Sequence, residues 1–79
     1  MQYLSDADGL ELARVVEFLP VYTDTTRKLV VMVQTDTPPQ VGSHLVVRDQ
    51  TGQVLARFVC QHARPWNGNT VRIIGESCE

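Results

Sequence analysis

The chain of 79 residues lacks long apolar runs, an apolar leader and a rich set of cysteines. Its longest purely apolar run covers residues 29–33, which is far too short to span a membrane. No basic stretch followed by an apolar one opens the sequence, so we expect no signal peptide. The two cysteines, Cys60 and Cys78, are too few for a disulfide framework. These absences predict a protein of the reducing cytoplasm that does not enter a membrane.

The sequence also lacks a strong excess of either charge. Seven basic and nine acidic side chains give a formal net charge of −2 at pH 7. A whole-chain field that attracts phosphate is therefore absent. Hydrophobic residues make up 43% of the chain and charged residues 20%, which is the composition of a globular domain. We expect one small domain over residues 1–79, with an ordered core from about residue 10 to residue 75.

Signature motifs of nucleotide-binding and hydrolytic enzymes are missing. The sequence contains no G-x-G-x-x-G, P-loop, G-x-S-x-G or H-E-x-x-H pattern. Its acidic residues form no convincing acid–base pair, because the aspartates fall where they stabilise turns. A domain of this size also has little room for a cleft carved from its core. The prediction is a protein that is not an enzyme and holds no cofactor.

What the sequence does contain is a series of short β-prone segments separated by turns. Residues 27–35 are rich in β-branched side chains that alternate between two faces, with Leu29, Val31 and Val33 on one of them. The prolines of residues 36–43 cannot donate ladder hydrogen bonds, so this strand ends there, and a second follows over residues 44–49. Residues 53–63 and 70–74 alternate in the same way. They predict two more strands.

Two turns set the register of the three C-terminal strands, which form an antiparallel meander. An even-length turn after residue 49 gives one register, whereas an odd-length loop with a bulge would reverse it. The Asn67-Gly68 pair predicts a type I′ hairpin turn. The cross-strand pairs predicted by the two turns are Val47–Ala56, Leu45–Phe58, Arg64–Val71, His62–Ile73 and Cys60–Gly75. In this register Cys60 and His62 both point inward.

Residues 9–19 fit two secondary structures. Asp8 with Glu11 resembles a capping box, and several apolar residues follow at helical spacing. The β-prone stretch of residues 14–18 equally suits a strand that pairs with residues 27–35. The strand gives an all-β fold, a small five-stranded antiparallel barrel, which we favour. The helix gives a β-rich α+β fold, with an N-terminal helix packed on a four-stranded antiparallel sheet.

In strand count and spacing, residues 10–75 resemble small barrels of the SH3-like type or of the second domain of translation factors. This resemblance contains no diagnostic motif, so it implies a fold and assigns no functional residue.

The predicted outer face alternates aliphatic side chains with arginines. It carries more apolar surface than a sheet with one covered side leaves exposed to water, so something is expected to cover it. Tryptophan and arginine dominate the binding energy of many protein interfaces. We therefore predict a non-catalytic binding module that contacts a protein partner or a second copy of itself. The residues expected to form this contact are Val46, Arg48, Leu55, Arg57, Val59, Arg64, Trp66 and Arg72.

Two other functions use some of the same residues. Single-stranded RNA would stack a base on Trp66 and place its phosphates against the arginines. A metal-dependent or thiol enzyme would use Cys60 and His62, with His44 and Cys78. Zinc sites usually have close-spaced ligand pairs, which are absent, and an inward thiol in mid-strand is poorly placed for attack. The sequence favours Cys60 as a core residue and a site without metal.

Overall fold

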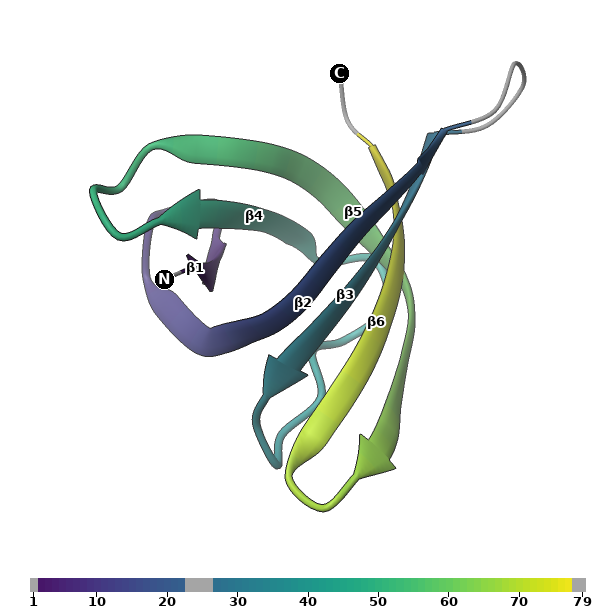
Figure 1. The fold of residues 1–79 in the computed structure, drawn as a ribbon. Coiled ribbons are helices and arrows are strands. Elements are labelled where there is room, and N and C mark those ends of the chain that lie inside the picture. The colour runs from purple at the N-terminus through teal and green to yellow at the C-terminus, as the bar shows by residue number, and fades with distance from the viewer. Residues whose placement is uncertain (1, 23–26, 78–79) are drawn as a thin grey trace.

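The computed structural model describes residues 2–22 and 27–77, whose regular elements are six β-strands. These are β1 (Gln2–Asp6), β2 (Glu11–Tyr22), β3 (Arg27–Gln34), β4 (His44–Asp49), β5 (Val54–Asn67) and β6 (Thr70–Ser77). All neighbouring strands are antiparallel, and they close into a barrel in the order β1-β2-β3-β6-β5-β4 (Figure 1). The prediction of a small antiparallel all-β barrel is confirmed, with six strands where five were expected. None of the described residues belongs to a helix long and apolar enough to cross a membrane.

The helical alternative for residues 9–19 is wrong, because residues 11–22 form β2. Ala13 and Val15 are buried while Arg14 between them is exposed, which is the alternation of a strand with one face on a core. β3 pairs with β2 from Arg14 to Tyr22 and satisfies its backbone. The β-branched residues of this stretch suit the pleated surface better than a helix.

β1 was not expected, since the ordered core was predicted to begin near residue 10. It pairs with β2 on one side and with β4 on the other, and so closes the barrel. Leu4 and Ser5 are 1% and 0% exposed. Only one of its five residues is a large aliphatic, which is why the sequence pattern did not mark it as a strand.

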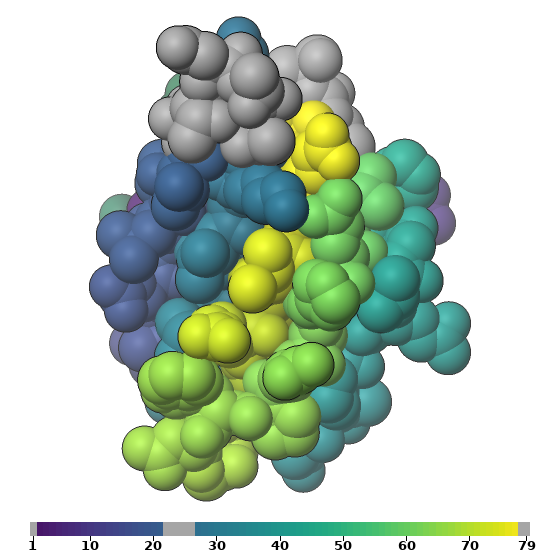
Figure 2. Space-filling model, turned by 90° about the vertical axis from the view of Figure 1, so that its right-hand side faces the viewer, coloured from purple at the N-terminus to yellow at the C-terminus, as the bar shows by residue number. Residues whose placement is uncertain are grey.

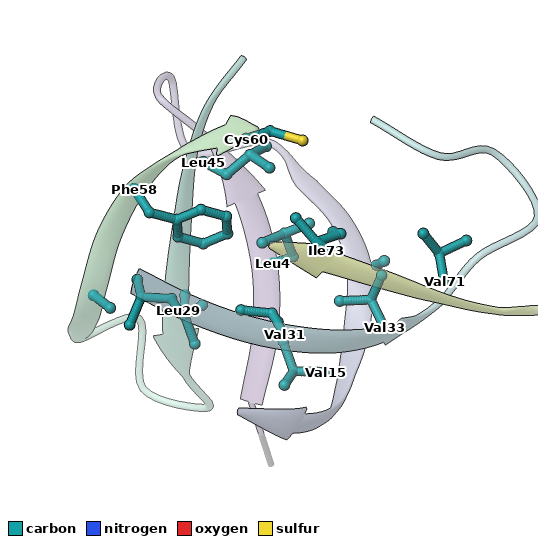
Figure 3. Packing of buried hydrophobic residues seen from close by; sticks show 13 residues of the cluster. Leu4, Val15, Leu29, Val31, Val33, Leu45, Phe58, Cys60, Val71 and Ile73 are labelled. Atoms are coloured by element: carbon teal, nitrogen blue, oxygen red, sulfur yellow. The ribbon is translucent and has the colours of Figure 1, made fainter. Parts of the chain in front are cut away.

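The interior of the barrel is filled by one cluster of aliphatic side chains around Phe58. Figure 3 shows these side chains pointing inward from the surrounding strands. The alternation predicted for β3, with Leu29, Val31 and Val33 on one face, is confirmed, because all three are fully buried. Gly75 on β6 lies against Phe58, where its missing side chain leaves room for the ring.

Five β-bulges interrupt the ladders. Each places one extra residue in a strand, which bends the strand and turns that side chain away from the regular alternation. Bends of this kind allow a small sheet to close. The extra residues are Leu12, Val16, Leu55, Gln61 and Trp66. All but Gln61 are exposed large apolar residues, so the bulges account for much of the apolar surface.

The bulges also decide which predicted pairs exist. Val47–Ala56, Leu45–Phe58 and Cys60–Gly75 are confirmed. The pairs His62–Ile73 and Arg64–Val71 are wrong, because the turn lies one residue further along the chain than predicted and the bulge at Trp66 offsets only part of that displacement. The bulge at Gln61 offsets the rest, which restores the predicted pairing at Cys60. Their observed partners are Ile74 for His62 and Arg72 for Arg64.

The hairpin turn between β5 and β6 differs from the predicted one. It is centred on Gly68-Asn69, since Asn67 pairs with Thr70. Gly68 has a φ of +57°, whereas Asn69 does not have a positive φ. A glycine with positive φ at the first central position is typical of a type II′ turn, and the predicted type I′ turn needs positive φ at both positions.

Candidate functional site

The structure separates the residues predicted to bind a partner into two groups along the outside of β5. Arg57 and Arg64 are seven residues apart on this strand, a distance of about 20 Å. Val46, Arg48 and Leu55 lie at the Arg57 end, where β4 is the neighbour, and Val59 lies between the groups. Trp66 and Arg72 lie at the Arg64 end, where β6 is the neighbour. One continuous patch was expected, and two surfaces are found.

The first surface is the outer side of the β5–β6 hairpin together with β3, called the hairpin face below. Figure 2 looks onto this side of the molecule, with β6 between β3 and β5. In one row across the three strands, Val30, Ile74 and His62 pair side by side; in the next row Met32, Arg72 and Arg64 do so. A hollow of about 190 Å³ lies among the last two residues of each row: Ile74, His62, Arg72 and Arg64.

Trp66 marks the end of the hairpin face. It is the extra residue of a bulge at the exposed tip of the hairpin, and its side chain is 58% exposed. The guanidinium carbon of Arg72 lies 4.7 Å from the centre of the indole ring. A cation–π contact at such an exposed site contributes about 0.5–1 kcal/mol. The contact orients both side chains on the surface.

The charges on the hairpin face are unbalanced. Arg64 and Arg72 stand directly opposite each other, and like charges in that relation destabilise a ladder. Within the described residues, neither of them forms an ion pair with a carboxylate. The carboxylate of Glu76, further along β6, accepts a hydrogen bond of 2.9 Å from Gln61. The two guanidinium groups thus face each other without a carboxylate between them among the described residues.

The second surface is a hollow of about 200 Å³ on the outside of β4, called the Val46 hollow below. Val46 was expected to be a contact residue, but it is only 6% exposed and lies at the bottom of the hollow. Arg48 is part-buried; its Nε donates to Ser5 Oγ at 3.0 Å and its Nη1 to the carbonyl of Gly52 at 3.1 Å. Arg48 thus joins three segments of the barrel instead of reaching freely into solvent. Arg57 is exposed at the rim.

Cys60 and His62 do not share a face, contrary to the prediction. Cys60 is buried in the core, and the bulge at Gln61 turns His62 outward, where it is exposed. Burial raises the pKa of the Cys60 thiol and so disfavours the thiolate that a nucleophile or a metal ligand requires. No group of three His, Cys, Asp or Glu side chains in the described part of the chain could hold a metal ion. Cys78 lies outside the described residues.

The sequence missed several residues that line these surfaces. His44 borders the Val46 hollow. It precedes Val46 by two residues in the strand, so the sequence could have placed both side chains on the same face. His62 lines the hairpin face only because of the bulge at Gln61, for which the sequence gives no signal, whereas Ile74 faces outward by the regular alternation of β6.

A third hollow, of about 420 Å³, lies between the start of β2 and the loop after β3. It was also not predicted. Its lining residues are Leu4, Leu12, Ala13, Thr35, Thr37, Pro38, Pro39 and Gln40.

The chain matches no protein-family model, no curated protein and no solved structure, so these surfaces alone carry the functional inference.

Proposed function

We propose that the protein is a small cytoplasmic, non-catalytic binding module that holds an acidic, partly apolar segment of a protein partner on its hairpin face. The observation that supports this most strongly is the facing pair of Arg64 and Arg72 beside the exposed ring of Trp66. Tryptophan and arginine are the residue types that most often dominate binding energy in protein interfaces.

The charge on this face favours an acidic partner. A carboxylate placed between Arg64 and Arg72 would remove the repulsion between two like charges. The planar guanidinium group matches a carboxylate with two parallel hydrogen bonds, which are stronger than bonds between neutral groups. Because Arg72 is already held against the indole of Trp66, less side-chain freedom is lost on binding.

The apolar side chains of the hairpin face favour a protein partner over a nucleic acid. Val30, Met32 and Ile74 are partly exposed and lie side by side next to the arginines. A partner segment with aliphatic side chains beside its acidic residues would cover this strip and exclude water from the charged pairs. A nucleic-acid backbone offers phosphate but little aliphatic surface.

Selection from a random peptide library on the immobilised protein tests the proposal. We expect peptides that combine Asp or Glu with large apolar residues. Arg64→Glu should weaken the selected peptides at least about tenfold, because it reverses a charge at a charge-assisted contact. Arg57→Glu is the matched control: it makes the same change on the same strand but lies about 20 Å away. It should leave the affinity within about twofold.

Two results would overturn the proposal. Either the selected peptides show no acidic enrichment, or Arg64→Glu and Arg57→Glu weaken them equally. Sedimentation of the free protein gives a separate check on self-association. A dimer that dissociates on Trp66→Ala would make the occupant of the hairpin face a second copy of the chain and would refute an external partner.

Single-stranded RNA is a second candidate, favoured by the exposure of Trp66. The guanidinium of Arg72 covers one face of the indole, and a base could stack on the other. Titration with single-stranded oligonucleotides should then quench the fluorescence of this lone tryptophan, with an affinity that falls steeply as salt rises. An unchanged emission spectrum at low salt would remove this candidate.

A further inference from the structure

The Val46 hollow is a second basic site, and it lies apart from the hairpin face. We propose that it binds a phosphate dianion, either free or as the terminal group of a phosphate monoester. The residues that line it are His44, Val46, Arg48 and Arg57, with Ala7, Leu45 and Phe58. This inference does not depend on the proposed protein partner, because none of these residues belongs to the hairpin face.

Three basic side chains line the hollow around the apolar side chain of Val46. His44 and Arg48 each lie two residues from Val46 on β4, so they project from the same side of the sheet at about 7 Å from it. Arg57 is the cross-strand partner of Val46 on β5, with their Cβ atoms about 5 Å apart. A tetrahedral anion can accept hydrogen bonds from three directions, whereas a planar carboxylate is satisfied by one guanidinium group.

Arg48 is held in place before any ligand arrives. Two of the five N–H groups of its guanidinium donate to Ser5 Oγ and to the carbonyl of Gly52, which leaves three for a ligand. Ser5 is itself fully buried between β2 and β4, so the acceptor cannot move away. A fixed guanidinium loses little conformational freedom on binding an anion.

The electrostatics and the size of the hollow both select a small anion. No Asp or Glu lines the hollow, and in the described part of the chain neither Arg48 nor Arg57 pairs with a carboxylate. The volume of about 200 Å³ is smaller than the pockets that take drug-sized ligands, so a phosphate group with its nearest substituent is a suitable occupant. Single-stranded nucleic acid needs an extended basic groove with aromatic platforms, whereas this hollow is small and its one phenyl ring, Phe58, is fully buried.

NMR titration of the ¹⁵N-labelled protein tests the site directly. The probes are sodium phosphate and methyl phosphate at neutral pH, with ionic strength kept constant by sodium chloride. We expect saturable shifts of the backbone amides of residues 44–48 and of Arg57. Sodium acetate at the same ionic strength should not reproduce them. If phosphate binds and methyl phosphate does not, the ligand is free phosphate; if both bind, the site accepts a monoester.

Two arginine variants on the same strand separate this site from general anion binding. Arg57→Ala should weaken phosphate at least about tenfold, because it removes charge-assisted hydrogen bonds. Arg64→Ala, which removes another exposed arginine of β5 outside the hollow, should leave the affinity unchanged. Arg57→Gln gives the same readout if the alanine variant no longer shows a dispersed spectrum. Equal weakening by the two alanine variants, or shifts that acetate reproduces, would overturn the inference.

Discussion

Gly75 is the position where adding one methyl group should destabilise the barrel most. A Cβ built at Gly75 would overlap the Phe58 ring at Cδ2 and lie 2.6 Å from the carbonyl oxygen of Val59. Phe58 is fully buried at the centre of the core, so its ring has no free space to enter. The Val59 oxygen belongs to the backbone of β5 and moves only if the ladder shifts.

Overpacking of a well-packed core costs typically about 1–3 kcal/mol, and a contact with fixed backbone places Gly75→Ala at the upper end, at about 3 kcal/mol. For a domain of this size, each kcal/mol lowers the Tm by about 4–8 °C, so the variant should melt about 12–24 °C below the wild type. Urea unfolding followed by the fluorescence of Trp66 measures the same loss at constant temperature.

Gly68→Ala is the matched control for this prediction. The space around its Cβ is open, but its φ of +57° is a left-handed conformation that costs a non-glycine residue about 1–2 kcal/mol. Gly75→Ala should therefore cost more than Gly68→Ala. In a Phe58→Leu background the cost of Gly75→Ala should fall, because a smaller side chain meets the added methyl group. A Gly75→Ala variant within about 1 kcal/mol of the wild type would refute the reasoning.

Three further predictions concern a core side chain, a buried thiol and a turn. Leu4→Ala should lower the free energy of unfolding by about 2–5 kcal/mol, whereas Leu10→Ala, at an exposed position, should change it by less than about 0.5 kcal/mol. Equal losses in urea would contradict the role of β1 in closing the barrel. Burial raises the pKa of the Cys60 thiol, so the unfolded thiol ionises first and stability falls as the pH rises through the alkaline range. Unfolding curves of Cys60→Ala over this range should decline less steeply, and parallel curves would speak against burial. The Thr51 hydroxyl and, to a lesser extent, backbone N–H groups lower the pKa of Asp49, so its stabilising effect is present at neutral pH and lost as the pH falls through that lowered pKa. The stability difference between the wild type and Asp49→Asn should shrink on acidification, and a constant difference would show that the Asp49 charge has no such role.

The inward faces of the strands could be predicted from the sequence because their pattern is local. Aliphatic residues alternate along residues 27–35 and 44–49, and a small barrel buries them when that face of each strand points inward. The paired residues Cys60 and Gly75 were also predicted correctly, although the assumed turn was wrong. The turn lies one residue further along the chain than assumed, which displaces the pairing of β5 with β6. The extra residues Trp66 and Gln61 offset this displacement, so the predicted pairing is recovered at Cys60.

The positions of the bulges could not be predicted, because they depend on where the strands of the whole barrel must bend for it to close. An extra residue in a strand is placed where the sheet must bend to close, and the local sequence gives little indication of that position. Nothing in the local sequence marks Gln61 or Trp66 as an extra residue, yet they decide that His62 faces solvent and that Arg64 faces Arg72. The exposed arginines of the candidate site were thus identifiable one by one, while their grouping into two surfaces was not.

The way β1 closes the barrel has a consequence for handling the protein. Release of this short strand would open two backbone edges together, one on β2 and one on β4. Unpaired edges accept strands from other molecules, so a chain in that state would swap its first strand with a neighbour or nucleate aggregates. Fusion tags and fluorescent labels attached next to Gln2 would promote that opening, and they belong elsewhere on the molecule.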